Sequence, residues 1–179
     1  MLRYVAFLRG MNLGGRRITN EELKGEFAAL GFEEVATFRA SGNVVFSSSS
    51  REKEAALTKR IEAGLGDGLG YEVPVFLRSC AEVAAIAASE PFDPKLVAAS
   101  KGKLQVSFLA KKPAAKARKS VLELSSDEDR LVVENRELFW LPSGGISESD
   151  LDWRPIDVAL GHGTIRTMGT VEQIAAKYC

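Results

Sequence analysis

The sequence predicts an α+β protein made of two similar lobes, each with an antiparallel sheet, the second lobe being incomplete. A chain of 179 residues is long enough for one domain or two small lobes. Its 45% hydrophobic and 27% charged residues are typical of a soluble globular protein. KLQVSFLA at 103–110 repeats the apolar pattern of RYVAFLRG at 3–10. We therefore expect a first lobe with a connecting helix over residues 1–90, a linker over 91–102 and a second lobe with a C-terminal helix over 103–179.

The first lobe is predicted from its apolar runs and turn signals. Residues 3–9 are nearly all apolar, which favours a strand covered on both faces. Thr19 and Glu22 form a capping box, and Pro74 indicates an edge strand. The predicted elements are a strand over 3–9, a helix over 19–31, strands over 35–40 and 43–47, a helix from 49 to the glycines at 66–70, and a strand over 71–77. This β-α-β-β-α-β order is the ferredoxin-like split unit, for which we expect the strand order 4-1-3-2.

The second lobe repeats this order without its last strand. Ser79 and Glu82 predict a helix that connects the lobes and runs to about residue 89, after which PFDP breaks the chain. The later predicted elements are a strand over 103–110, a helix over 113–124, a hairpin over 130–135 and 137–141, a helical stretch over 149–160 and a helix over 170–178. The last strand is expected to be missing or replaced.

Residue counts restrict the chemistry and the compartment. Cys80 and Cys179 are expected to be two separate thiols without a disulfide, because the apolar run at 4–8 is too short for a signal peptide and the cytoplasm is the default. No membrane span is predicted. His162 is the single histidine, so the usual zinc and transition-metal patterns cannot form, and no nucleophile turn accompanies it. We predict no metal site and identify no cofactor; magnesium held by carboxylates stays open.

Charge is neutral in sum but arranged in blocks. Lys plus Arg and Asp plus Glu each number 24, which argues against a protein whose whole surface binds nucleic acid. Residues 95–120 hold eight bases and no acid, whereas residues 121–157 hold three bases and ten acids. The basic block is interpreted either as a solvated helix face, partly neutralised by the acidic block, or as a phosphate-binding surface.

Candidate ligand-binding residues gather at one rim of the first lobe. In the predicted sheet the first strand ends where the third and fourth begin, so the loop at 9–17, the turn at 39–43 and the loop at 66–70 share one edge. Arginine forks suit phosphate or carboxylate, and glycine-rich backbone can direct N–H groups at an anion. The alternative is a turn that needs glycine for positive φ, with solvated arginines. The candidates are Arg9, Gly10, Asn12, Gly14, Gly15, Arg39, Ser41 and Asn43.

RNA recognition on the sheet face is not supported. The third strand reads NVVFS and lacks the aromatic run of an RNA-recognition sheet. Trp140 and Trp153 can stack a base in principle, but packing is the preferred interpretation.

Three motifs carry a resemblance to a known family. YVAFLRGMNLGG at 4–15, SGNVVF at 41–46 and GTIRTMGTV at 163–171 resemble the bacterial domain-of-unknown-function 1697 family. The resemblance implies two ferredoxin-like lobes and no established activity. The family's closing motif is similar to T-T-R-N-W-N-T-V. Thr164, Arg166, Thr170 and Val171 match it, whereas Ile165, Thr167, Met168 and Gly169 depart from it, so Arg166 is the charged group left to carry that motif's role.

These observations favour a cytoplasmic protein that binds a small anionic, for example phosphorylated, ligand at the first-lobe rim. Arg9, Arg39 and Arg166 would hold the anion, and Asn12, Ser41 and Asn43 would orient it. No positioned general base is visible, so catalysis stays open. Two alternatives also stay open: nucleic-acid association through residues 95–120, and a protein-interaction module without a small-molecule site. For Arg9 the competing explanation is an internal ion pair with Glu33 or Glu72. No membrane partner is expected, and the oligomeric state is undetermined.

Overall fold

Two four-stranded antiparallel sheets organise the chain, one in each half. The computed structural model describes residues 1–11, 14–39 and 42–179. Contacts divide it into a first unit, Met1–Ala85 with Ile174–Cys179, and a second unit, Ile86–Gln173. The strand within 103–110 pairs inside the second sheet and not the first. The predicted α+β fold and its internal duplication are therefore confirmed.

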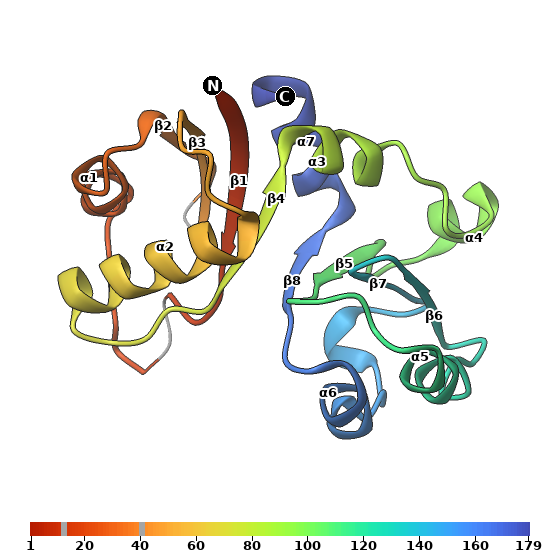
Figure 1. The fold of residues 1–179 in the computed structure, drawn as a ribbon. Helices are drawn as coiled ribbons and strands as arrows, with labels where there is room; N and C mark the ends of the chain where they lie inside the picture. Colours follow the sequence, from red (N-terminus) through yellow and green to blue (C-terminus); the bar gives the residue numbers. More distant parts are fainter. Residues whose placement is uncertain (12–13, 40–41) are drawn as a thin grey trace. The chain divides into compact units, whose positions relative to one another are not determined.

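The first unit has the predicted β-α-β-β-α-β order (Figure 1). Its sheet order is β2-β3-β1-β4, as expected, with β4 at an edge. The buried run of β1 fits its place between β3 and β4. The elements are β1 (Leu2–Leu8), α1 (Asn20–Ala29), β2 (Glu33–Thr37), β3 (Asn43–Ser48), α2 (Glu54–Leu69), β4 (Val75–Ser79) and α3 (Cys80–Ala87).

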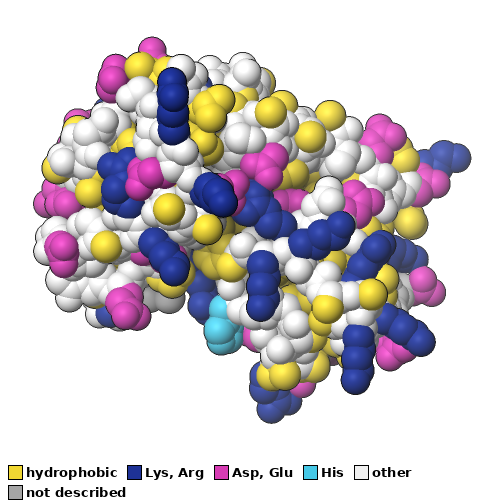
Figure 2. Space-filling model, in the orientation of Figure 1, with side chains coloured by type: hydrophobic (Ala, Val, Ile, Leu, Met, Phe, Trp, Pro, Cys, Tyr) yellow, Lys and Arg dark blue, Asp and Glu magenta, His cyan; other side chains and the backbone are white. Residues whose placement is uncertain are grey.

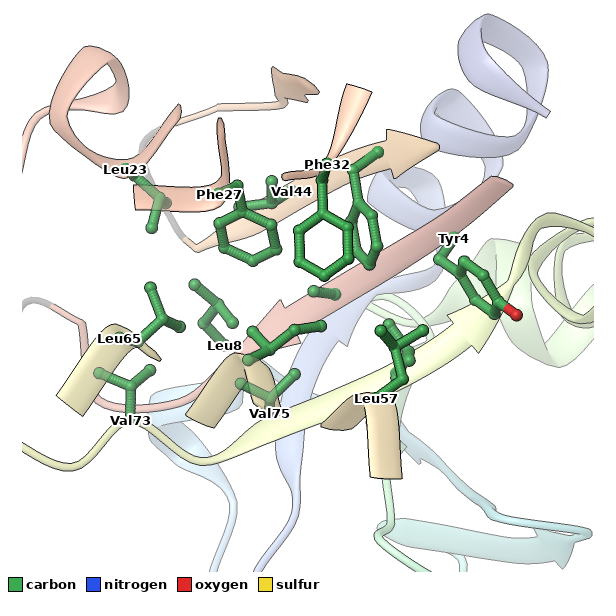
Figure 3. Packing of buried hydrophobic residues seen from close by; sticks show 14 of the residues in the cluster. Tyr4, Leu8, Leu23, Phe27, Phe32, Val44, Leu57, Leu65, Val73 and Val75 are labelled. Atoms are coloured by element: carbon green, nitrogen blue, oxygen red, sulfur yellow. The ribbon is translucent and has the colours of Figure 1, made fainter. Parts of the chain in front are cut away.

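Side chains from both helices and all four strands fill one face of this sheet. Figure 3 shows Phe27 of α1, Phe32 and Val44 gathered over the sheet, with Leu57 and Leu65 of α2 beside them. The Phe32 and Phe46 rings lie 4.4 Å apart between centroids. This core fixes the end of β1, from which the candidate site begins.

Several predicted boundaries in the first unit are wrong. Helix α2 runs through its glycines to Leu69 and ends at Gly70, which has φ +76°. Its N-cap is Lys53 without a side-chain cap, not Ser49. Strand β2 begins earlier than predicted, with a register irregularity between Glu33 and Ala36. Strand β4 begins after Pro74, because proline cannot donate to the ladder.

The second unit completes a related β-α-β-β-α-β arrangement. Its sheet order is β6-β7-β5-β8, which mirrors the first sheet. The elements are α4 (Pro94–Ala99), β5 (Gln105–Phe108), α5 (Ala115–Leu122), β6 (Asp129–Glu134), β7 (Glu137–Pro142), the 3-10 turn η1 (Ile146–Glu148), α6 (Trp153–Leu160), β8 (Thr164–Thr167) and α7 (Met168–Tyr178).

Two predictions for the second half are corrected. The last strand is present as β8, so this lobe is not incomplete; β8 escaped prediction because TIRT has only four residues and one large apolar side chain. The expected linker contains α4, which is capped by Asp93 and starts with Pro94. Trp140 and Trp153 pack edge to face at 5.2 Å between centroids, as the packing interpretation predicted.

The prediction that the two cysteines stay apart is also wrong. A disulfide joins Cys80, the first residue of α3, to Cys179, the last residue of the chain. Both belong to the first unit, and 99 positions of sequence separate them. Closeness between positions so far apart depends on the whole fold and has no local sequence signal.

A helix that spans a membrane must be both long and predominantly apolar. None of the helices in residues 1–11, 14–39 and 42–179 has the length and apolar character that crossing a bilayer requires.

Candidate functional site

Three connections of the first unit meet where β1 ends. The Leu8 amide donates to the Gly42 carbonyl at 2.8 Å, which ties β1 to the β2–β3 turn. The Arg9 amide donates to the Pro74 carbonyl at 3.0 Å, which ties it to the segment before β4. We call this edge the rim: residues 9–11, 14–17, 38–39, 42–43 and 70–74. Its third connection is 70–74 and not 66–70, because α2 extends to Leu69.

Gly42 and Asn43 hold the β2–β3 turn in place. Gly42 has φ +71°, and a Cβ there would lie 3.0 Å from Met11 Cγ and 3.3 Å from the Leu8 carbonyl oxygen. Asn43 is 1% exposed, and its Nδ2 donates to the Phe38 carbonyl at 3.0 Å. The Phe38 amide in turn donates to the Asn43 carbonyl. Asn43 therefore joins the two ends of the β2–β3 connection, whatever it contributes to a ligand.

The loop after β1 has an open backbone at its described glycines. Gly10, Gly14 and Gly15 have φ of 72°, 64° and 80°, values that L side chains adopt at a cost. A Cβ on Gly14 or Gly15 would have no neighbour among the described atoms within 4 Å. Glycine is used here for its backbone conformation and not for tight packing, so a ligand can approach these peptide groups.

Three arginines accompany these glycines without a carboxylate partner. Arg9 is half-buried, whereas Arg16 and Arg17 are exposed. The Arg16 guanidinium lies 4.2 Å from the centroid of Tyr71, whose ring packs against the core. Across the described ranges none of the three pairs with an acidic side chain, and residues 12, 13, 40 and 41 carry no acid. The predicted alternative for Arg9, an ion pair with Glu33 or Glu72, is not formed.

Arg39 approaches the same edge from the β2–β3 turn. It is exposed and has φ +59°, a left-handed conformation that is uncommon for a residue other than glycine. Its guanidinium lies 5.5 Å from the centroid of the neighbouring Phe38 ring. A non-glycine residue held in this conformation costs of order 1–3 kcal/mol and is frequent at ligand sites.

The other three predicted residues are Asn12, Ser41 and Arg166. Asn12 and Ser41 lie outside the described residues. Arg166 lies on β8 of the second unit, where its Nη1 donates to Thr164 Oγ1 and to the Ile165 carbonyl, both at 2.8 Å. Burial lowers the pKa of Arg166 to about 10. Within the described chain, Arg9, Gly10, Gly14, Gly15, Arg39 and Asn43 share the rim.

Sequence reasoning missed Tyr71 and an acidic hollow in the second unit. The sequence predicts Tyr71 in a strand. In the structure Tyr71 directly follows Gly70, where α2 ends, and its ring lies beside the Arg16 guanidinium. The hollow has a volume of about 550 Å³, and Glu128, Asp129, Glu148 and Asp150 are among its lining residues. Asp129 Oδ1 accepts hydrogen bonds from Trp140 Nε1 and Ser149 Oγ, each at 2.7 Å, which ties this carboxylate into the fold. None of the predicted site residues lines it.

Comparisons with other proteins address the family and the fold. A family model described as "Protein of unknown function (DUF1697)" matches residues 1–139. The solved structure of the conserved bacterial protein SP0830 from Streptococcus pneumoniae is similar, with a TM-score of 0.77 and 22% sequence identity over 98% of this chain and 97% of that one. At that identity the likeness concerns the fold alone. A search of curated proteins finds no match.

Proposed function

We propose that this chain, which belongs to the DUF1697 family, binds a small anionic ligand carrying a phosphate or carboxylate at the rim of the first unit. The observation that carries the proposal is Arg9: a half-buried residue directly after a central strand, without an acidic partner in the described chain. With no acidic side chain beside it, this guanidinium gains more from the charge and hydrogen bonds of an external anion than from the protein groups around it.

The neighbouring groups suit a phosphate or carboxylate. Arg16 and Arg17 add two further forked donors on the same loop. Gly14 and Gly15 leave the backbone open to close approach. Arg39 approaches from the adjacent turn.

A protein-interaction module without this site has less support. Apart from the adjacent Met1 and Leu2, the large exposed apolar residues of the described chain lie on separate segments: Leu96, Leu124, Ile146, Val158 and Ile165. Single exposed apolar side chains are normal on a soluble surface.

The test compares Arg9→Met with the wild-type protein, because methionine keeps most of the aliphatic stem. The probes are inorganic phosphate, pyrophosphate and a panel of nucleotides, phosphosugars and coenzymes in a thermal-shift experiment. A ligand at about 100 times its dissociation constant stabilises the wild-type protein by about 2.7 kcal/mol. We expect that stabilisation to vanish in Arg9→Met, while the unliganded variant is at least as stable as wild type.

Arg51→Met is the matched control. Arg51 is exposed and follows β3, whose other end carries the rim, so this variant should keep the ligand response. A loss of about 3–5 kcal/mol in unliganded Arg9→Met would indicate a buried ion pair and would contradict the proposal. An unchanged ligand response in Arg9→Met would do the same.

A further inference from the structure

The second unit repeats the topology of the rim, with lysines in place of the arginine and glycine loop. The Leu109 amide donates to the Arg136 carbonyl at 2.8 Å, as the Leu8 amide donates to Gly42 in the first unit. Asn135, in the β6–β7 turn, has φ +49° and Arg39, in the β2–β3 turn, has φ +59°. The connection that follows β5 carries Lys111 and Lys112, and no acidic residue lies between β5 and α5. Both units therefore place cations where the first strand of the motif ends.

In the second unit these cations continue along α5. Lys116, Arg118 and Lys119 lie on the helix, and all five basic side chains are exposed. The first turn of α5 holds no acidic residue. None of the five makes an ion pair in the part of the chain that the structure describes. Glu123, the first acidic residue of the block that follows, lies beside Lys112, Arg118 and Lys119, so both predicted interpretations of the basic block stay open.

A shallow hollow follows this cationic surface, which we define as Lys111, Lys112, Lys116, Arg118 and Lys119. It has a volume of about 500 Å³ and is lined by three cations, Lys112, Arg118 and Lys119, by one carboxylate, Glu123, and by the apolar residues Pro113, Ala115 and Leu122. Figure 2 shows Lys and Arg side chains gathered over the part of the second unit that contains α5.

We propose that this cationic surface binds the phosphate backbone of double-stranded nucleic acid without sequence preference. Four of its five cations are lysines, which are depleted in protein–protein interfaces but are ordinary phosphate contacts. No aromatic residue lies between Lys111 and Lys119 to stack unpaired bases, so a duplex backbone suits it better than a single strand.

The sheet of the second unit does not offer an alternative platform for bases. Every residue of its central strands β5 and β7 is buried. Trp140 lies within the core beside Trp153. Contact with nucleic acid therefore falls to the cationic surface.

The experiment measures binding of a fluorescent random-sequence 20-base-pair duplex by anisotropy at several salt concentrations. Each phosphate contact contributes about −0.9 to the slope of log K against log salt, so five contacts predict a slope of about −4.5. Affinity should then fall about 500-fold between 50 and 200 mM salt. The variant K111Q/K112Q/K116Q/K119Q keeps Arg118 alone, and its affinity should fall only about 3.5-fold over the same range.

The control variant R51Q/K53Q/K59Q/K95Q also removes four exposed positive charges, but none of them from the cationic surface. It should keep the wild-type slope, and circular dichroism verifies that both variants fold. The proposal is overturned by absence of duplex binding at 50 mM salt, by a wild-type slope in the lysine variant, or by an equal loss in the control. Tighter binding of poly-glutamate or of single strands than of the duplex would also overturn it, in favour of an acidic protein or an unpaired nucleic acid.

Discussion

The Cys80–Cys179 disulfide is expected to be a principal source of stability in the first unit. That unit is assembled from two chain segments, Met1–Ala85 and Ile174–Cys179, and the loop closed by the bond includes all of the second unit. Replacing both cysteines by serine removes the cross-link. In the chain-entropy treatment a loop of about 100 residues contributes about 4.7 kcal/mol, and measured losses are typically about 2–4 kcal/mol.

Noncovalent contacts hold only part of the C-terminal segment Ile174–Cys179, which we call the tail. Ile174 is fully buried, and the Tyr178 ring meets Phe38 edge-on at 6.3 Å between centroids. An aromatic pair of this kind adds about 0.5–1.5 kcal/mol. The tail should therefore stay docked through Ile174 in the double serine variant, while the last turn of α7 loosens. We expect a net loss of about 2–4 kcal/mol, seen as a lower urea midpoint in the unfolding of the first unit.

Three samples decide this prediction: air-oxidised wild type, wild type with a dithiol reductant, and Cys80→Ser/Cys179→Ser. The second and third should unfold at the same urea concentration, below the first. Thiol titration of the denatured, unreduced wild type should find no free thiol. Two free thiols, or a double variant within about 0.5 kcal/mol of oxidised wild type, would refute the reasoning. The same titration on protein trapped in cells tests the expected cytoplasmic location, because that compartment keeps thiols reduced.

Two further predictions concern the rim and acid stability. Gly42→Ala should lower the free energy of unfolding by about 2 kcal/mol, because φ is +71° and the new methyl group meets Met11 and Leu8. Gly15→Ala should lower it by about 1 kcal/mol, because φ is +80° but the methyl group points into open space. Equal urea midpoints for the two variants would contradict this difference. Hydrogen bonding from Ser47, and then Arg3, lowers the pKa of Glu34 below its ordinary 4.5, so its stabilisation is present above that pH and is lost as the pH falls through the lowered value. Glu34→Gln should flatten the decline of the urea midpoint between pH 5 and pH 3, and an unchanged decline would count against this assignment.

Much of the fold could be predicted because its signals are local. Apolar runs located the central strands, and the capping boxes at Thr19 and Ser79 marked the starts of α1 and α3. Strand order then followed from the β-α-β-β-α-β pattern. The candidate rim was predictable for the same reason, since strand order alone brings the last residues of β1 and β2 and the first residue of β4 to one edge.

The features that escaped prediction depend on distant contacts. The glycines inside α2 suggest that the helix ends early, yet a Cβ on Gly64 would collide with the Leu30 side chain, and one on Gly68 would displace the end of the Glu26 side chain. These glycines therefore allow α1 and α2 to approach closely. Burial of Leu57, Ile61 and Leu65 along one stripe offsets their low helix propensity. Neither this packing nor the disulfide has a signal in the neighbouring residues.

The two units use one topological position with different chemistry, and that difference separates the two proposals. In the first unit the connection after β1 is long, contains glycines with positive φ and carries arginines, whose planar guanidinium groups suit a small anion. In the second unit the connection after β5 is short and leads into α5, whose lysines suit an extended array of charges. Arg9→Met should thus abolish the response to small anions and leave the salt slope for duplex unchanged. The lysine variant should do the reverse. If either variant abolished both responses, the two surfaces would not be independent, and the assignment of one ligand class to each unit would fail.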